Sequence, residues 1–528
     1  MSLTRFAIVF MFTFSSIISF GQAKSKEAKV KWTQEQKESR RSTLSGIIGK
    51  DRTGIYALKR EANFMSASTF TIEHYDNNMK LLTSTEFNLK EGRKVKFFEG
   101  SIMSKGNLYI FSSFRNKGSR INYFFKQSVN LKTLKLNNDL EEIAQINFKG
   151  FSKYNAGGFF FDTSRDSSKF LVYYDRPYEK EEKEEMGIIV FDQDLNKIYN
   201  KDITLPYEDQ LYRTQDFIVD NKGNFHILGK LYKDKPKNTR KGKPNYFYQV
   251  LSYYDNGETR EKYPIEVTGK YLNDMQLAID ANGNLACGGF YATNASFNVD
   301  GSYWLKIDAK TKEIVSKNFK EFSIDFITQN MKARKEKKYK RKEAKGKEIE
   351  LYRYYLDDII FHADGGSVLI GEQFFITTSI SSDQNGQSTT IVRYHFNDII
   401  VVKVNKAGEI EWAKKIPKVQ VSINDGGFYS SYHLSVVRDK LYFVFNDNPK
   451  NLFNKGDGKL KNYVLNKECL TVLVTMDSKG DFKKEALFDT REAEVYIRPK
   501  VGRQVGFRET ILFGQKRKIQ KLAKVTFR

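Results

Sequence analysis

The chain repeats a short pattern of turn and strand residues, and this repeat limits what it can fold into. The stretch DNKGNFHILGKLY covers Asp220–Tyr232, and DANGNLACGGFYA covers Asp280–Ala292. Both carry Asp, Gly, Asn and a second Gly at matching places. Asp-x-x-Gly-Asn is a tight-turn signature, because Gly and Asn tolerate positive φ and the Asp side chain bonds to the local backbone. The apolar residues that follow each turn predict buried strands.

Looser copies of the pattern, and a second pattern between them, extend the repeat over the chain. The second pattern is an apolar strand, a short polar turn and a more polar strand, as in IIVFDQDLNKIYNKDI from Ile188. It predicts a β-hairpin that ends on an exposed edge. The looser copies of the first pattern are SKGNLYIFSSF from Ser104, RDSSKFLVYYD from Arg165, ADGGSVLIGEQF from Ala363 and RDKLYFVFND from Arg438, with DRTGIYALKRE from Asp51 and FRETILFGQKR from Phe507 as the first and last members.

Together the two patterns give a unit of four strands, here named a to d, joined by a tight turn, a loop and a short turn. The unit length suits a four-stranded blade with insertions. Immunoglobulin-like sandwiches need about seven strands per ~100 residues with crossing connections. We therefore predict an all-β fold over residues 42–528, a β-propeller of seven or eight four-stranded blades, and we count eight units.

The first residues predict export. Residues 1–21 have a positive start, an uncharged apolar run at Phe6–Phe20, and small residues at Ser19 and Gly21 before a cut. The run is shorter than the ~20 residues that a membrane-spanning helix needs; the alternative is an N-terminal anchor. We expect a signal peptide and a mature chain without a transmembrane helix, in the periplasm, at the cell envelope or secreted.

Residues 22–41 contain a segment that we expect to supply the strand that closes the ring. The last unit offers at most three strands, ending with KLAKVTF at Lys521–Phe527, and AKVKW at Ala28–Trp32 can supply the missing strand. Thr33-x-x-Gln36 matches a capping box, which predicts a short helix at Thr33–Arg41. The alternative is a disordered N-terminal tail.

The net charge of +24 is spread unevenly along the chain, and one segment supplies +7 of it. Lys332–Glu348, inside a basic insertion at residues 323–350, holds ten Lys or Arg and three Glu. Its composition favours a helix, but it has no regular apolar stripe. It is therefore either a solvated arm or a charged segment that binds an anionic partner. Because an exported protein seldom meets nucleic acid, we expect anionic polysaccharide, lipopolysaccharide or an acidic protein as partner, with peripheral association to the envelope. The alternative is a basic surface that serves solubility alone.

The long insertions all fall in the b–c and d–a connections, whereas the a–b and c–d turns are short. Strand alternation places the long connections on one face of the propeller, and loops on a rigid scaffold are where binding usually occurs. The long insertions are Asp175–Met186, Lys233–Lys243, Thr377–Asn397, Asn446–Lys467 and Lys332–Glu348.

Residues at the start of each strand a should surround the channel mouth on this face. Tyr and Arg suit recognition because they combine flat contact area with directed hydrogen bonds; the alternative is packing between blades. The candidate binding residues are Tyr154, Asn155, Tyr212, Arg213, Asn273, Asp274, Tyr354, Asp357, Tyr432, His433 and Arg498.

Motifs for known chemistry are missing from the sequence. HExxH, a P-loop, GxGxxG after a strand and GxSxG do not occur. His362-x-Asp364 and His395-x-x-Asp398 each offer two ligands, which is fewer than a metal site needs. Cys287 and Cys469 give neither a disulfide framework nor a zinc site, although a single bridge between them stays open. We predict no catalytic residues, no cofactor and no metal.

These turn and strand patterns resemble those of secreted bacterial β-propellers in general, over nearly the whole mature chain. The resemblance carries no catalytic residues with it. It favours an exported, non-catalytic binding module that recognises a protein or an anionic glycan through the face with the long b–c and d–a loops. The alternative is a glycan-active hydrolase or lyase at the channel mouth. That enzyme would need two carboxylates or a Tyr/His/Arg set, for which Asp274, Asp357, His433 and Arg498 are the candidates.

Overall fold

The computed structural model describes residues 25–528 except 40, 63–67, 149–155, 241, 266, 268, 295–297, 330, 332, 346–350, 383–386, 454–458 and 466–467. The predicted signal peptide at residues 1–21 lies outside the described residues, as do Tyr154 and Asn155.

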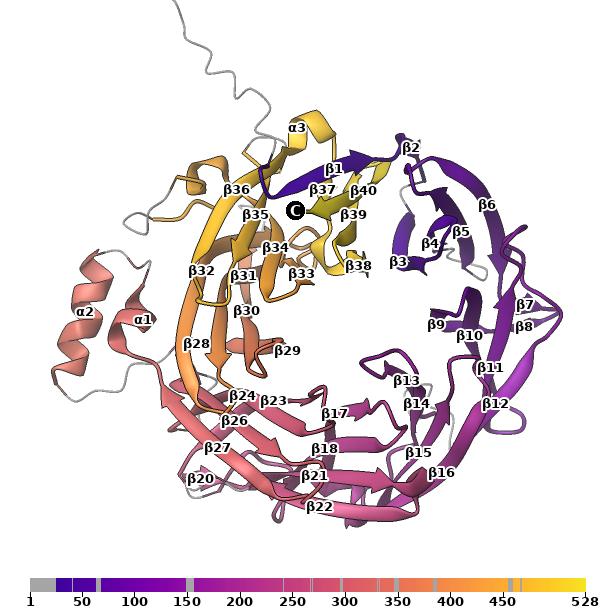
Figure 1. Ribbon diagram of the computed structural model, residues 1–528, viewed down its shortest axis with the longest axis horizontal. Coiled ribbons are helices and arrows are strands. Elements are labelled where there is room, and N and C mark those ends of the chain that lie inside the picture. Colours follow the sequence, from indigo (N-terminus) through magenta and orange to yellow (C-terminus); the bar gives the residue numbers. More distant parts are fainter. Residues whose placement is uncertain are drawn as a thin grey trace, which may run out of the picture.

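Eight antiparallel sheets of four or more strands make up most of the described chain; seven have four strands and one has six. Figure 1 shows them in chain order around a central opening; in the seven four-stranded sheets the first strand is innermost and the last outermost, and in the six-stranded sheet β1 is on the outside. This arrangement is a β-propeller.

The first four sheets follow the predicted a–b–c–d order along the chain. They consist of β3 (Ser42–Lys50), β4 (Gly54–Glu61), β5 (Thr69–Asp76) and β6 (Leu81–Asn88); β9 (Phe97–Ser104), β10 (Asn107–Asn116), β11 (Ile121–Val129) and β12 (Glu141–Asn147); β13 (Gly158–Thr163), β14 (Phe170–Asp175), β15 (Lys183–Phe191) and β16 (Lys197–Glu208); and β17 (Tyr212–Val219), β18 (Phe225–Tyr232), β21 (Tyr246–Tyr254) and β22 (Thr259–Ile265).

The remaining sheets continue the order, and the last one contains the first and the last strands of the described chain. They consist of β23 (Tyr271–Ile279), β24 (Leu285–Ala292), β26 (Gly301–Ile307) and β27 (Ile314–Glu321); β29 (Tyr354–Phe361), β30 (Ser367–Ser382), β31 (Ser388–Val404) and β32 (Ile410–Ile423); β33 (His433–Val437), β34 (Lys440–Asp447), β35 (Leu470–Met476) and β36 (Phe482–Asp489); and β37 (Tyr496–Ile497), β38 (Arg503–Gly506), β39 (Glu509–Lys516), β40 (Ile519–Phe527), β1 (Ala28–Trp32) and β2 (Gln36–Lys37).

Short elements decorate the connections. Three two-stranded sheets pair β7 (Lys90–Glu91) with β8 (Lys94–Val95), β19 (Thr239–Arg240) with β20 (Lys243–Pro244), and β25 (Asn298–Val299) with β28 (Leu351–Tyr352). The helices are α1 (Ile324–Thr328), α2 (Ala333–Glu343), α3 (Thr490–Ala493) and the 3₁₀ turns η1 (Asp209–Leu211), η2 (Asp255–Gly257), η3 (Pro449–Asn451) and η4 (Pro499–Val501). Among the described residues no helix is long and apolar enough to cross a membrane.

The hydrophobic core lies between neighbouring sheets. In one cluster Leu228 and Val250 from the sheet of β17 pack with Met275 and Leu285 from the sheet of β23, and all four side chains are buried. Strands b and c therefore bury both faces, as continuous apolar runs such as LTVLVTM in β35 require. The polar outer strands face solvent on alternate residues, as in β6.

Aspartates on the inner strands join one sheet to the next. Asp162 Oδ2 accepts a hydrogen bond from the Val219 backbone N–H at 2.9 Å, Asp216 Oδ2 from Leu277 N–H at 2.8 Å, and Asp274 Oδ2 from Leu356 N–H at 2.7 Å. These bonds connect β13 to β17, β17 to β23 and β23 to β29. Inner strands are short of hydrogen-bonding partners on their channel side, and each carboxylate supplies one.

The ring is closed by a strand from the N-terminus. β1 pairs antiparallel with β40 from Ala28↔Phe527 to Trp32↔Ala523. The Trp32 ring also packs edge-on against Phe488 of β36, with centroids 4.9 Å apart. The first and the last strands of the described chain thus lie in one sheet, and the outer edge of β40 is covered.

The helix expected at Thr33–Arg41 does not form, and this prediction was wrong. Thr33 Oγ1 accepts a hydrogen bond from the Leu522 backbone N–H at 3.0 Å, and Gln36–Lys37 forms β2 on β40. The threonine that matched a capping box thus binds the neighbouring strand, because pairing with β40 satisfies the backbone better than an isolated helical turn does.

The connections are unequal on the two faces. The longest a–b connection is residues 164–169 and the longest c–d connection is residues 130–140. The longest d–a and b–c connections are residues 322–353, which contain α1 and α2, and residues 448–469. The segment Thr377–Asn397, expected as a loop, mostly extends β30 and β31 instead, since its β-branched residues favour strand.

Candidate functional site

The predicted site residues that the structure describes do not form one site. Asp357 and Tyr432 meet on the channel wall, and Tyr212 and Arg213 lie together in a cleft between the sheets of β13 and β17. The others lie apart, in positions where most of them hold the scaffold.

Several of these residues have structural partners. The carboxylate of Asp274 joins β23 to β29, as described above, and Asn273 Nδ2 donates to the Asn298 carbonyl oxygen at 2.6 Å. Tyr354 is 4 % exposed and belongs to a hydrophobic cluster. Their positions at the start of inner strands were read correctly, but their side chains turn toward the neighbouring backbone or core.

His433 and Arg498 are also engaged. Burial lowers the pKa of His433 to about 4, and its Nε2 lies 3.2 Å from Ser435 Oγ. The Arg498 guanidinium stacks over the Phe428 ring at 3.8 Å from the centroid and donates from Nη1 to Thr43 Oγ1. Burial lowers the pKa of Arg498 to about 10. Neither side chain converges with Asp357 or Asp274 into the Tyr/His/Arg set that an enzyme of the alternative class needs.

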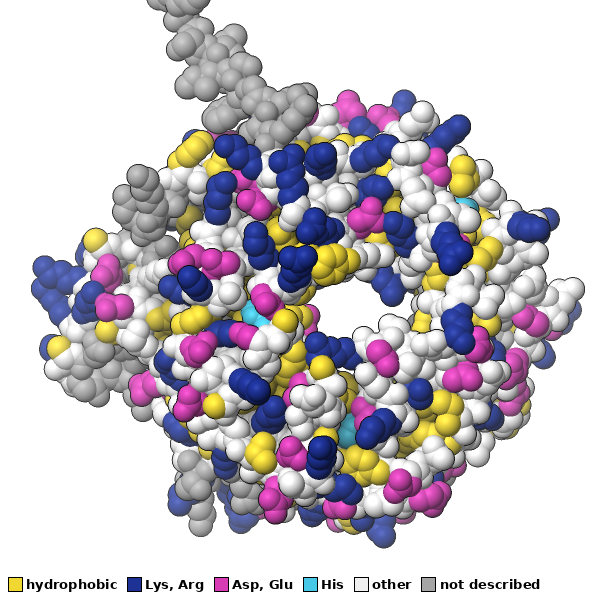
Figure 2. Space-filling model, in the orientation of Figure 1, with side chains coloured by type: hydrophobic (Ala, Val, Ile, Leu, Met, Phe, Trp, Pro, Cys, Tyr) yellow, Lys and Arg dark blue, Asp and Glu magenta, His cyan; other side chains and the backbone are white. Residues whose placement is uncertain are grey.

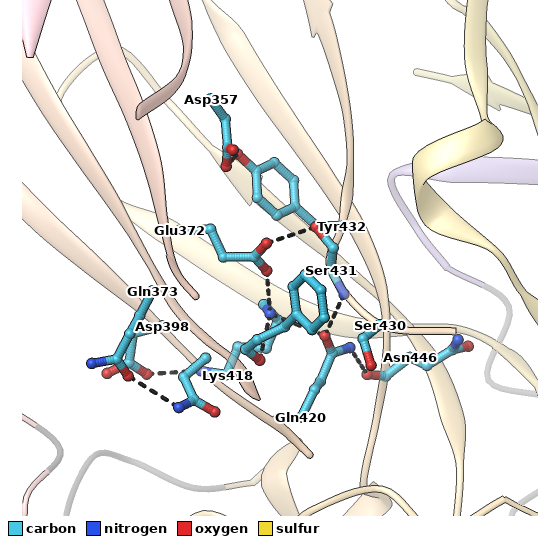
Figure 3. Close-up of polar contacts among 12 residues, drawn as sticks. Asp357, Glu372, Gln373, Asp398, Lys418, Gln420, Ser430, Ser431, Tyr432 and Asn446 are labelled. Carbon is cyan, nitrogen blue, oxygen red and sulfur yellow. Dashed lines mark hydrogen bonds and ion pairs between the residues drawn. The ribbon is translucent and has the colours of Figure 1, made fainter. Parts of the chain in front are cut away.

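We define the channel-wall cluster as Asp357, Glu372, Lys418, Gln420, Ser431 and Tyr432, which connect the sheets of β29 and β33 (Figure 3). The Tyr432 hydroxyl donates to Asp357 Oδ2 at 2.6 Å, and the Ser431 hydroxyl donates to Glu372 Oε2 at 2.7 Å. Lys418 Nζ lies 2.6 Å from Glu372 Oε1. Asp357 comes from an innermost strand and Glu372 from the strand behind it, so the cluster runs from the channel surface into the blade.

The inner half of the channel-wall cluster is fully satisfied. The Lys418 side chain is 0 % exposed and also donates to the Phe396 carbonyl oxygen at 2.9 Å and to Gln420 Oε1 at 3.0 Å. Gln420 in turn donates to the Asn446 carbonyl oxygen at 2.7 Å. Burial lowers the pKa of Lys418, against the opposing charge of Glu372. A buried ion pair with every donor used is a means of fixing two sheets together rather than a reactive group.

The outer half of the channel-wall cluster offers one titratable group. Asp357 is accessible from the channel, but surrounding protein desolvates it, and this together with the charge of Glu372 raises its pKa to about 7. Such a carboxyl can exchange a proton near neutral pH. Glu372 cannot act as its partner in glycoside cleavage, because it is buried and bound to Lys418.

A second feature is the helix α2, which belongs to the longest d–a connection, residues 322–353, and lies outside the ring of sheets (Figure 1). Arg334, Lys337, Lys338, Arg341, Lys342 and Lys345 recur at the three- and four-residue spacing that places side chains on one side of a helix. All six are exposed and line a shallow hollow of about 420 Å³. We call these six residues the basic face. In Figure 2 a group of Lys and Arg side chains stands out at the left edge of the molecule, over α1 and α2.

The other side of α2 is anchored. Lys340 Nζ lies 3.2 Å from Asp325 Oδ1 of α1 and 2.9 Å from Glu336 Oε1. Tyr339 packs against the hydrophobic cluster that contains Phe322 and Ile327. The helix is therefore held against the outside of the ring with its cations pointing outward.

The histidine pairs noted in the sequence have other partners. Lys403 Nζ lies 3.0 Å from His362 Nδ1 and 2.9 Å from Asp364 Oδ2. His395 stacks on Phe375 at 4.2 Å between ring centroids. Across the described part of the chain, no three His, Cys, Asp or Glu side chains gather as a metal site would require, and both cysteines are free and buried.

Sequence reasoning missed Glu372, Lys418 and Gln420, which lie within strands and carry no turn signal. It identified Lys332–Glu348 as either a solvated arm or a contact for an anionic partner, but it did not give the basic face, although the spacing of the six cations is readable from the sequence. Asp175 and Glu184 line the cleft that contains Tyr212 and Arg213. Sequence reasoning noted them only as part of the acidic insertion Asp175–Met186.

Comparison with known proteins identifies no family. No protein-family model and no curated protein sequence matches the chain. Among solved structures, the WD40 domain of SCAP from fission yeast aligns at 7% identity and a TM-score of 0.40, over 95% of this chain and 94% of that one. An oligogalacturonate lyase in complex with manganese aligns at 12% identity and a TM-score of 0.37, over 96% and 98%. The β-propeller domain of the Trilobed protease from Pyrococcus furiosus aligns at 12% identity and a TM-score of 0.35, over 85% and 97%. At these scores the matches add nothing to what the sheet topology shows.

Proposed function

We propose that the chain is an exported, eight-bladed propeller that binds an anionic partner, either an anionic glycan or an acidic protein surface, without catalysing a reaction. The partner docks on the face that carries the long b–c and d–a connections. The observation that carries this proposal is the basic face of α2.

The basic face has the properties of a docking element. Six cations on one side of a short helix repel one another, so the arrangement lowers the stability of the helix until an anion neutralises it. The ion pair of Lys340 with Asp325 and the packing of Tyr339 hold the helix in place, so little ordering is needed on binding. Residues 322–353, which carry it, form a d–a connection. The net charge of +24 further attracts a polyanion at long range.

The test is binding of a carboxylated polysaccharide, polygalacturonate, and of polyglutamate, at several salt concentrations. Replacing Arg334, Lys337, Lys338 and Arg341 by Gln should weaken binding about tenfold or more and flatten its salt dependence, because fewer ions are displaced. The matched control replaces four exposed lysines of the a–b and c–d turns, Lys132, Lys222, Lys310 and Lys479, by Gln. Equal losses of affinity in both variants would show general attraction by net charge and contradict a role for the basic face. Absence of binding by the unmodified chain would contradict the proposal altogether.

A second candidate, a glycan-active hydrolase or lyase, is favoured by one observation. Asp357 is an accessible carboxyl with a pKa near 7, and it accepts a hydrogen bond from Tyr432. An assay for new reducing ends or unsaturated products from anionic polysaccharides decides it. Activity that disappears in Asp357→Asn and in Tyr432→Phe, with the fold retained, would replace the binding proposal for the channel.

A further inference from the structure

A cleft between the sheets of β13 and β17 carries charge opposite to that of the rest of the molecule. It has a volume of about 610 Å³ and opens near the start of β17. Four carboxyl side chains line it: Asp175 at the end of β14, Glu184 in β15, Asp209 in η1, and Asp216 in β17, which is already bound to the Leu277 backbone N–H. We call it the acid cleft. A neighbouring groove of about 710 Å³ shares Arg176 and Asp209 with it and adds Glu179, Glu181, Glu182 and Glu185.

The arginines of the acid cleft do not neutralise these carboxylates fully. Arg213 Nη1 donates to the backbone carbonyl oxygens of Asp209 at 2.9 Å and Tyr212 at 2.6 Å. Arg176 Nη2 is bound to Asp202 Oδ1 at 2.8 Å. Burial raises the pKa of Glu184 to about 9, and the negative charges of Asp175 and Asp209 add to this effect. Burial and the charge of Asp209 likewise raise the pKa of Asp175 to about 6.

The walls of the acid cleft are aromatic. Tyr173 stacks on Phe217 at 4.8 Å between ring centroids, and Phe160 lies 5.8 Å from Tyr173. Phe160 and Tyr178 are each 46 % exposed at the rim. Exposed rings beside carboxylates are the surroundings that stabilise organic cations, because the ring faces and the carboxylates attract the same charge.

An independent feature points into the same cleft. Tyr212 lines it, is 2 % exposed, and its hydroxyl is buried without a hydrogen-bond partner. A buried hydroxyl left unpaired has lost its hydrogen bonds to water, so a ligand group that pairs with it recovers that cost. The neighbouring Tyr173 hydroxyl is already engaged with Thr214 Oγ1 at 3.1 Å.

A metal ion suits this cleft poorly. In the described part of the chain no three acidic, histidine or cysteine side chains lie close enough together to coordinate one. The carboxylates are instead spread around a space that fits a molecule of several non-hydrogen atoms with charge and apolar surface together.

We propose that the acid cleft binds an organic cation, an ammonium or guanidinium group carried on an aliphatic chain. The cation lies among Asp175, Glu184 and Asp209, its aliphatic part lies against Phe160 and Tyr178, and a polar group of the ligand pairs with the Tyr212 hydroxyl. The source of the cation is either a free polyamine or a basic side chain of a peptide. The site is separate from the basic face and serves a ligand of opposite charge.

The experiment is calorimetric titration with spermidine and with trilysine at low salt, and with acetylated trilysine and calcium chloride as comparisons. We expect spermidine or trilysine to bind, whereas the acetylated peptide and calcium do not. Spermidine alone identifies a polyamine site, and tighter binding of trilysine identifies a peptide site. The double variant Asp175→Asn/Glu184→Gln should bind about tenfold more weakly or not at all, since it loses the Asp175 carboxylate and the Glu184 carboxyl, which a bound cation would ionise.

The matched control is Asp194→Asn/Glu258→Gln, which makes the same two side-chain changes at exposed turns elsewhere and should change affinity less than about twofold. Phe160→Ala, at an exposed rim position, is a second variant that tests the aromatic wall should the double variant fail to fold. Polygalacturonate binding by the double variant should be unchanged, which separates this site from the proposed function. Equal affinity in the cleft and control variants, calcium binding that displaces trilysine, or no binding of either cation would overturn the proposal.

Discussion

Glu184 is a residue whose ionisation the fold controls, and its effect on stability can be measured. In an unfolded chain it would titrate near 4.5, whereas in the folded chain burial and the charges of Asp175 and Asp209 raise its pKa to about 9, against the smaller effect of Arg213. Between these values the folded form holds a proton that the unfolded form has released. Glu184 therefore lowers the free energy of unfolding as the pH rises from about 4.5 to about 9.

Glu184→Gln should remove this part of the pH dependence. At pH 8 the variant should be more stable than the unmodified chain by about 1 kcal/mol or more, since each unit of pKa shift is worth about 1.4 kcal/mol. At pH 4.5 the two should be nearly equal. Chemical denaturation across this range measures it, with Asp194→Asn as the control that should track the unmodified chain. A variant less stable at pH 8 than at pH 5 by the same margin as the parent would contradict the account.

The inner-strand aspartates give a second prediction for single residues. Asp216→Ala leaves the Leu277 backbone N–H without its acceptor and should lower the free energy of unfolding by about 1–3 kcal/mol. Asp216→Asn keeps a side-chain oxygen at the same place and should lose much less. Thermal unfolding of both variants checks this, and similar losses for Ala and Asn would show that the charge matters rather than the bond.

For single residues, the sequence indicated the place in the fold better than what each side chain does there. It placed Asp357 and Tyr432 at the start of inner strands, where they do meet, but it placed Asp274 and His433 there on the same grounds. What separates them is the direction of each side chain, which depends on a register shift at Leu272/Asp274 and on contacts with the next sheet. Such contacts between sheets have no local pattern, and for the same reason Lys418 and Glu372 were not found.

Among the strands and helices, β1 is the short element whose removal we expect to lower the melting temperature most. A chain that begins at residue 25 keeps the pairing of β1 with β40, whereas one that begins at residue 33 exposes the edge of β40 and the Phe488 ring. The shorter chain should melt several degrees lower and should associate through the open edge. Calorimetry and light scattering compare the two, and identical melting curves would show that the ring does not depend on this closure.

The strands themselves were largely predictable, because turn residues mark their ends and apolar runs mark the inner members. The helix expected at Thr33–Arg41 and the loop expected at Thr377–Asn397 were wrong for one reason. In both cases pairing with a neighbouring strand, β40 in one and the partner strand of a long hairpin in the other, outweighed a local signal. A capping box or a polar stretch predicts structure only where no strand edge lies alongside.

The molecule as a whole combines a closed ring of sheets, short turns on one face, and charged connections on the other. The ring makes the scaffold rigid, so the α2 helix and the acid cleft are held at fixed places around it. The sequence predicted the ring and the uneven faces, because turn lengths can be counted along the chain. It also placed the acidic insertion Asp175–Met186 and the basic segment Lys332–Glu348 on the same face, but it did not predict the cleft that Asp175 and Glu184 line with Asp209, since that depends on which sheets become neighbours.

The most direct measurement of the central claim is amide hydrogen exchange with and without bound polygalacturonate. We expect slower exchange in α2 and the turn after it, residues 333–345, and in the long connections such as residues 448–453, with the a–b and c–d turns unchanged. Slower exchange confined to those turns, or spread evenly over both faces, would contradict it.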